Sequence, residues 1–399
     1  MTVAIKSMEE VFGFSALCAS KLFARDSPSP YYIGAARLAV HDEAIVVKAY
    51  GTEINLRLHC FFVNTASAQC ETLLNPRVNP LDFSAGPDDE VRHLLTLQDH
   101  TLVIDQSFIE LVHAIIFLSV VAEIPLTEKQ LKALRNSIIF IACIRAGRYD
   151  LLAKLGAPEA ISAIISDAFQ SGAIGKRLLP AIQYIVSHEA THWVYGFRSK
   201  GFDIDGEHAA FRPMLKKEFE KALRRSRQNH VSHYGEDAAE YAAQSLQRRI
   251  DYWLGAGWEE VLCDLQGFRS AISMAGEAGV KISSAIVAIN SVHKALSCIQ
   301  LAIDEISGSE EISRVGARSL LAETIGCIFL QNYTDAERDV TAKMVSQANR
   351  RLVNLIAAPL TQEISDLKAV RYSGGVDARK IVNEYGFDIY KPGSIVLLG

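Results

Sequence analysis

The residues best suited to chemistry in this sequence are His188, Glu189 and His192, which form the HExxH motif His-Glu-Ala-Thr-His. On a helix, positions 188 and 192 lie one turn apart on the same face. Two neutral imidazoles placed in this way can bind one metal ion, and a glutamate after the first histidine can reach a water molecule on that ion. The motif therefore predicts a hydrolytic zinc site. The simpler interpretation is a core helix with hydrogen-bonded histidines.

A catalytic zinc ion needs a third protein ligand and keeps a fourth position open for water. The segment Trp-Glu-Glu-Val-Leu-Cys-Asp-Leu at 258–265 offers Glu260 and Asp264, four positions apart among apolar residues. We expect Glu260 to bind Zn²⁺, and Asp264 to accept the second ring N–H of a zinc-binding histidine and so fix its tautomer. The dipole of a helix also favours acidic residues at its start, but that explanation leaves Asp264 without a role.

The order of the two motifs, HExxH and then ExxxD, resembles the gluzincin clan of zinc metallopeptidases. Their separation is distantly similar to that in the phage-exclusion protease Lit and in the CAAX-processing zinc endopeptidases. Residues 63–68, followed by the apolar run 102–105, also look like the edge hairpin that precedes the zinc helix in several such families. The resemblance implies a zinc endopeptidase whose peptide substrate pairs with an edge strand above the metal.

The predicted activity is hydrolysis of a peptide bond in a protein substrate, with Zn²⁺ held by His188, His192 and Glu260. Glu189 is the predicted general base. His293 is the first candidate for stabilising the oxyanion, and the other candidates are Tyr195, His230, His233 and Tyr234. Two alternatives stay open, namely a non-peptide amide hydrolase with the same zinc site and a catalytically silent protein that binds a partner.

The composition is that of an ordinary globular protein. The 399 residues are 49% hydrophobic and 22% charged, with a net charge of −5, so no general affinity for nucleic acid is expected. The seven cysteines are scattered and form no CxxC pair, which indicates buried free thiols in a reducing compartment. The first 20 residues lack the pattern of a signal peptide, and the apolar runs 114–122 and 138–144 are too short to cross a bilayer. We expect a cytoplasmic protein without membrane insertion and make no prediction of its oligomeric state.

The segment 212–227 is rich in lysine and arginine. One interpretation is a patch for an acidic partner or for nucleic acid. A solvated helix face within an insertion between the two zinc motifs is the preferred interpretation, because no aromatic residues are interleaved for base stacking.

Strand-like patterns are concentrated before residue 106, and helical patterns follow from 107 onward. The predicted fold class is α+β and predominantly helical, a zincin-like fold with a small β-sheet packed on the HExxH helix. The predicted units are an N-terminal helix and linker at 1–30, a metallopeptidase domain at 31–306, and C-terminal helices with an irregular tail at 307–399. Within the second unit we expect a β-rich part at 31–106, a helical part at 107–306 and a basic helical insertion at 199–257.

Overall fold

A computed structural model describes eleven stretches of the chain. These are residues 44–49, 52–63, 70–72, 99–120, 126–146, 148–155, 161–164, 172–195, 209–308, 314–370 and 395–398. The predicted N-terminal helix and linker at 1–30 lie outside them, as does the 64–68 part of the proposed edge hairpin.

Helices make up most of the described chain. In chain order they are α5 (Gln106–Val120), α6 (Glu128–Arg145), α7 (Tyr149–Leu155), α8 (Ile161–Ile164), α10 (Gly172–Tyr195), α12 (Phe211–Tyr234), α13 (Glu236–Leu254), α14 (Trp258–Glu277), α15 (Ile282–Ser307), α16 (Arg314–Leu330), α17 (Asp335–Leu352), the π-helical turn η3 (Val353–Ala357) and α18 (Ala358–Ala369). A capping box precedes α6, because the side chains of Thr127 and Gln130 each accept a hydrogen bond from the other residue's backbone N–H.

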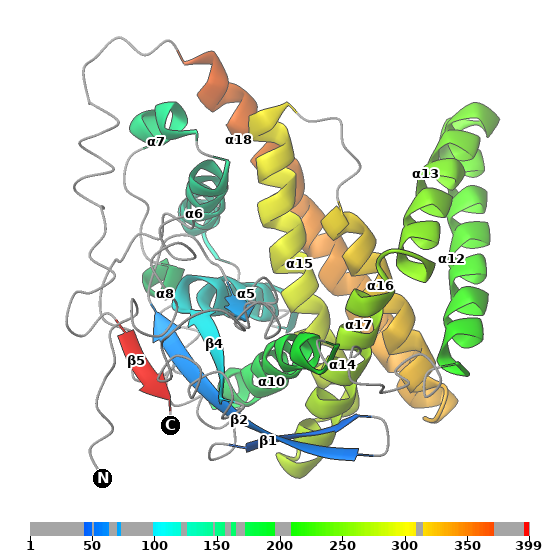
Figure 1. Ribbon diagram of the computed structural model, residues 1–399. Helices are drawn as coiled ribbons and strands as arrows, with labels where there is room; N and C mark the ends of the chain where they lie inside the picture. Colours follow the sequence, from blue (N-terminus) through cyan, green and yellow to red (C-terminus); the bar gives the residue numbers. More distant parts are fainter. Residues whose placement is uncertain are drawn as a thin grey trace, which may run out of the picture.

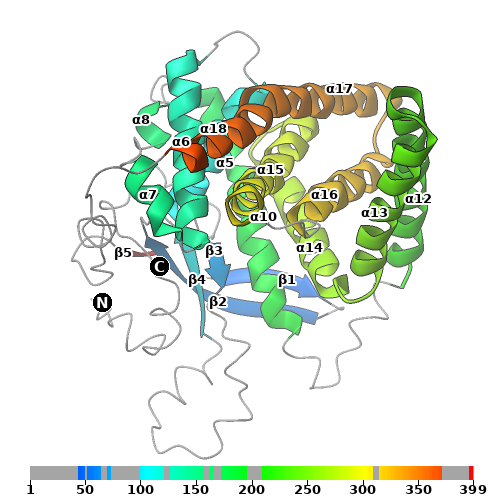
Figure 2. The ribbon, with the colours of Figure 1, turned by 90° about the horizontal axis from the view of Figure 1, so that it is seen from above.

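Helix α15 lies at the centre of the helical body, and α5, α6, α10, α14, α16, α17 and α18 all pack against it (Figures 1 and 2). By length and composition α15 could cross a membrane, but 67% of its most apolar window is buried inside the protein. One hydrophobic core extends from Phe108 in α5 to Ile364 in α18. The helices before and after position 306, which is the predicted end of the metallopeptidase domain, therefore share one core.

The strands are β1 (Ala44–Ala49), β2 (Thr52–Val63), β3 (Cys70–Thr72), β4 (Asp99–Asp105) and β5 (Ile395–Leu398). Their backbones pair in the order β1-β2-β4-β3, with β5 also on β2. The β2–β4 pair is parallel, with Cys60 opposite Leu102, and the other pairs are antiparallel.

The predicted α+β, zincin-like fold is wrong. Every regular element whose side chains the structure describes is a helix, and the strands are described by their backbone pairing alone. A zincin-like small sheet packed on the HExxH helix is therefore not shown, and the described protein is a helical one. The alternating pattern at 52–63 did predict a local extended conformation, but local periodicity does not determine which layers build the core.

Two prolines lie inside helical segments. Helix α10 begins at Gly172, so Pro180 lies inside it. Pro359 follows the π-helical turn η3, which joins α17 to α18 without a break, and the carbonyl of Leu355, four residues earlier, accepts a hydrogen bond from Arg135 instead.

Candidate metal centre

The candidate centre lies where α10 and α14 pack against each other. Gln183 donates a hydrogen bond to Ser270 Oγ at 2.6 Å, and one turn further along α10 His188 lies next to Asp264. Contacts therefore move toward the start of α14 as they move toward the end of α10, so the two helices run antiparallel. The faces in contact carry positions 183, 184 and 188 of α10 and positions 260, 264, 267 and 270 of α14, which follow helical spacing.

The predicted pair of His188 and Asp264 is present. His188 Nδ1 lies 2.7 Å from Asp264 Oδ1, which is a hydrogen-bonding distance. The other ring nitrogen, Nε2, lies 3.6 Å from Glu260 Oε2. Asp264 is fully buried and His188 is 4% exposed, whereas the Glu260 side chain is 32% exposed. The pair thus orients Nε2 of the imidazole toward the carboxylate that has access to solvent.

This arrangement fits a zinc ion. Two ligands on one tetrahedral zinc, each bound at about 2.0–2.2 Å, are separated by about 3.4 Å. The 3.6 Å between His188 Nε2 and Glu260 Oε2 is close to that spacing. A carboxylate on the distal nitrogen of a zinc-binding histidine is also the usual arrangement, because it fixes the tautomer and makes the imidazole more basic.

His192 is the remaining predicted ligand, and its side chain lies outside the described residues. Its backbone belongs to α10, one turn beyond His188 on the same face. Because the helices are antiparallel, that turn lies toward the start of α14, where Glu260 is. Among the side chains that the structure describes, which do not include that of His192, no three His, Cys, Asp or Glu residues lie together in a way that could hold a metal ion.

Carboxylates accumulate around the centre. The thiol of Cys263 is fully buried, which raises its pKa well above the usual value, and the nearby charges of Glu260, Glu259, Asp264 and Glu189 raise it further. The Cys263 sulfur therefore lies close enough to acidic residues of both α10 and α14 to be affected by their charges. A site with this negative potential favours a bound cation.

Tyr184 is part of this site, although the sequence did not single it out. Its buried hydroxyl donates a hydrogen bond to Asp264 Oδ1, the oxygen that also faces His188. Its ring meets Phe268 edge-on at a centroid distance of 5.6 Å and His293 at 5.2 Å. The available signal was its position four residues before His188, which places both side chains on one helix face.

Gly267 makes the close packing of the two helices possible. A Cβ atom at this position would lie 2.8 Å from two ring carbons of Tyr184 and 3.0 Å from the Tyr184 carbonyl oxygen. Because one of these atoms belongs to the backbone of α10, a side-chain rotation could not relieve the overlap. A glycine inside a helix costs about 1 kcal/mol relative to alanine, so a glycine in the middle of an apolar helical pattern is the signal in the sequence for this close approach.

The other predicted residues are distributed as follows. Glu189 is partly exposed and follows His188 in α10. His293 is 1% exposed and its ring packs on the ring of Tyr184, so in the described structure it belongs to the buried core around Tyr184. The side chains of the alternative oxyanion donors lie outside the described residues, and these are Tyr195, His230, His233 and Tyr234.

Replacing Gly267 by alanine is expected to separate α10 from α14 and to weaken the contact between Asp264 and His188. We predict a loss of about 1–3 kcal/mol in the free energy of unfolding, as for other overpacked cores, and weaker zinc binding, measured by chemical denaturation and by metal titration. The matched control is Gly276→Ala in the same helix, where an added Cβ meets nothing within 4 Å. Equal effects of the two substitutions would contradict the proposed role of Gly267.

Replacing Tyr184 by phenylalanine removes the hydroxyl that supports Asp264 and keeps the ring that packs on Phe268. Because changes to such supporting groups typically weaken metal binding 10–100-fold, we predict a loss of zinc affinity in that range with a retained fold, measured by competition with a chromogenic chelator. Tyr241→Phe is the control, since Tyr241 is 71% exposed. Unchanged zinc affinity in Tyr184→Phe would show that the hydroxyl does not position His188 through Asp264.

Comparison with known proteins identifies no family for this chain. No family model, no curated protein sequence and no solved structure matches the chain. The function is therefore inferred from the residues of the centre and from the distances between them.

Proposed function

We propose that the protein is a zinc-dependent endopeptidase of gluzincin type. The observation that carries the proposal is the orientation of His188, which has Nδ1 at 2.7 Å from the buried Asp264 and Nε2 at 3.6 Å from Glu260. In this arrangement a metal-facing nitrogen and a solvent-accessible carboxylate lie side by side. The spacing of HExxH and ExxxD in the sequence supports the same ligand set.

His188, His192 and Glu260 are the residues that would hold the zinc ion. When bound, zinc supplies Lewis acidity toward water and toward a substrate carbonyl. Asp264 keeps the proton of the imidazole on Nδ1, so that the lone pair of Nε2 is available to the metal. Tyr184 in turn holds the Asp264 carboxylate in place.

Glu189 is the residue that moves protons in this proposal. It follows His188 directly, and its side chain is partly exposed rather than buried. A carboxylate at that position accepts a proton from the attacking water and returns it to the leaving amine. Asp264, which is completely buried, has no access to substrate, so the two carboxylates serve different purposes.

The first test of the proposal is the metal content of Glu260→Ala. We predict that the wild-type protein, purified without added zinc, contains one zinc ion per chain and that this variant contains substantially less, measured by inductively coupled plasma mass spectrometry. The matched control is Glu259→Ala, which removes a neighbouring, exposed carboxylate about 100° away around the helix. Equal zinc in the wild type and Glu260→Ala would exclude Glu260 as a ligand, and absence of zinc from both would contradict the enzyme proposal.

The second test is the activity of Glu189→Gln. This variant is expected to retain its zinc and to lose hydrolysis by a factor of about 10²–10⁴, because it lacks the general base. Peptides from a proteome digest serve as substrates, and mass spectrometry detects new termini. The same variant should retain uncleaved substrates, whose identification distinguishes a peptide from a non-peptide amide. Undiminished cleavage by Glu189→Gln would remove this residue from the mechanism.

A further inference from the structure

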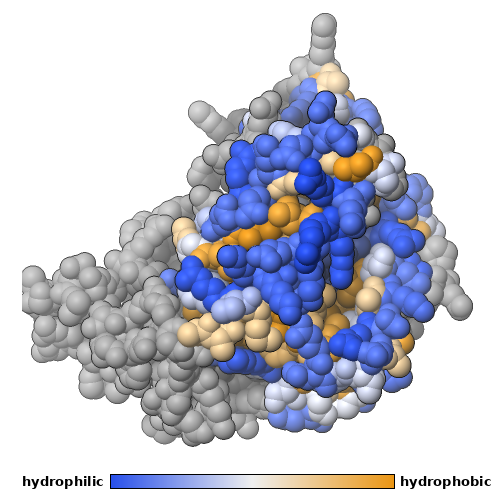
Figure 3. Space-filling model, turned by 90° about the vertical axis from the view of Figure 1, so that its right-hand side faces the viewer, coloured by the Kyte–Doolittle hydropathy of each residue, from blue (hydrophilic) through white to orange (hydrophobic). Residues whose placement is uncertain are grey.

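A groove lies on the side of the molecule formed by the antiparallel helices α12 and α13 and the first turn of α14. Its volume is about 750 Å³, within the usual range for ligand sites. Arg212, Lys216 and Glu220 line it from α12, and Ile250, Leu254 and Trp258 line it from α13 and α14. In Figure 3 this face is largely hydrophilic, with an elongated hydrophobic hollow between the hydrophilic ridges.

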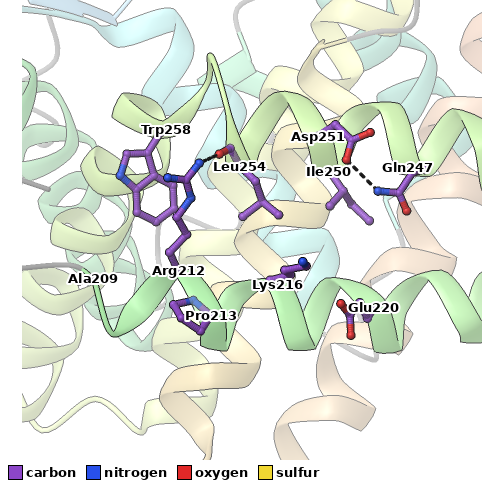
Figure 4. Close-up of a pocket in the computed structure, with 10 residues that line it drawn as sticks. All are labelled: Ala209, Arg212, Pro213, Lys216, Glu220, Gln247, Ile250, Asp251, Leu254 and Trp258. Atoms are coloured by element: carbon purple, nitrogen blue, oxygen red, sulfur yellow. Dashed lines mark hydrogen bonds between the residues drawn. The ribbon is translucent and has the colours of Figure 1, made fainter.

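The groove is held in shape by contacts across it. The Arg212 guanidinium stacks over the Trp258 ring, 5.0 Å from its centroid, and also donates a hydrogen bond to the Leu254 carbonyl oxygen (Figure 4). Gly235, with a φ of 87°, ends α12 and allows α13 to begin at the next residue. Because the groove is already formed, less conformational entropy is lost when a partner binds than if its side chains had to become ordered on binding.

The charge of α12 differs from that of the whole protein. This helix has seven lysines and arginines and two glutamates, so its net charge is +5 in a chain whose net charge is −5. Lys216, Lys217, Arg224, Arg225 and Arg227 are exposed along it. Such a local concentration of positive charge attracts an acidic partner and increases the rate of association.

The floor of the groove is apolar, and its charged lining residues are the basic Arg212 and Lys216 and the acidic Glu220 and Asp251. Ile250 is 4% exposed, and Leu254 continues the same apolar strip one turn later. A segment that presents one apolar face and several acidic residues is complementary to this floor and to the exposed basic residues of α12.

A protein segment fits this groove better than a nucleic acid does. Glu220 and Asp251 also line the groove and would repel a continuous phosphate backbone. The Trp258 ring is covered by Arg212, so this face of the indole is not available for base stacking. A peptide can instead place its acidic side chains beside Lys216 and its backbone N–H groups beside the two carboxylates.

The groove and the candidate metal centre share one turn of α14. Trp258 and Glu260 are two positions apart, so they leave the helix about 200° apart, on opposite sides of a cylinder roughly 10 Å across. A segment docked in the groove would therefore lie near the metal centre without occupying it. Taken with the proposed peptidase activity, on which this step rests, we propose that the groove is an exosite for an acidic amphipathic segment of the protein substrate.

The test measures binding of a fluorescein-labelled peptide made of Asp, Glu, Leu and Phe to the full-length protein by fluorescence anisotropy. The double variant Lys216→Glu/Lys217→Glu is expected to weaken binding at least tenfold, because it replaces attraction by repulsion at Lys216 in the groove and at its exposed neighbour on α12. Lys129→Glu/Lys132→Glu in α6 is the matched control, since it changes two exposed lysines by the same total charge. Its affinity is expected to stay within twofold of the wild type.

Two further probes make the test decisive. A peptide with Asn and Gln in place of Asp and Glu is expected to bind at least tenfold more weakly, and a DNA duplex is not expected to compete. Equal loss of affinity in both lysine double variants, equal binding of the neutral peptide, or effective competition by DNA would each overturn the proposal. Peptide binding is measured with wild type and Glu260→Ala in parallel, so a failure of the exosite is distinguishable from a failure of the metal site.

Discussion

The close approach of α10 to α14 at Gly267 is the constraint on which the candidate centre depends. A Cβ there would overlap both the ring and the backbone of Tyr184. Only at this helix separation does the Tyr184 hydroxyl reach Asp264, and only then does Asp264 come within 2.7 Å of His188 Nδ1. Gly267, which has no side chain, thus determines the orientation of the His188 imidazole on the neighbouring helix. Asp264 lies about one turn before Gly267 on α14, and His188 lies about one turn after Tyr184 on α10. Because interiors are close-packed, even a methyl group is not absorbed without movement of the helices.

Burial of the Asp264 carboxylate costs free energy of desolvation, and its hydrogen-bonding partners have to offset that cost. Transfer of a carboxylate out of water costs several kcal/mol unless partners satisfy it. Asp264 is fully buried and has two partners on one oxygen, the Tyr184 hydroxyl and the His188 ring. An apolar pair of similar volume would stabilise the packing of α10 on α14 at least as well. A functional requirement on His188 Nε2 therefore explains the polar pair better than a purely structural role does.

The sequence predicted which helix faces of the candidate site meet better than it predicted the three-dimensional context. HExxH and ExxxD have helical spacing, and a four-residue period is sufficient to place His188 and Asp264 on faces that can meet. The same local rules could not identify Gly267, because its importance arises from a helix that lies far away in the sequence. They also could not exclude the zincin-like sheet, because an alternating pattern at 52–63 indicates a strand without indicating which elements form the core. Local rules do not locate the start of α10 either, because a proline favours the first turn of a helix, whereas Pro180 lies inside α10.

The opposite charges of α12 and of the metal centre restrict how a substrate can bind. Glu189, Glu259, Glu260 and Asp264 make the centre strongly negative, so a run of acidic residues would be repelled from it. The basic face of α12 lies on the other side of α14 and attracts the same residues. For the proposed peptidase, an acidic segment therefore binds with least repulsion when it lies along α12 and a less charged part of the substrate continues past the first turn of α14 to the candidate metal centre. The docking segment and the cleaved bond of the proposed substrate would then belong to different parts of it, with selectivity in the segment that is not cut.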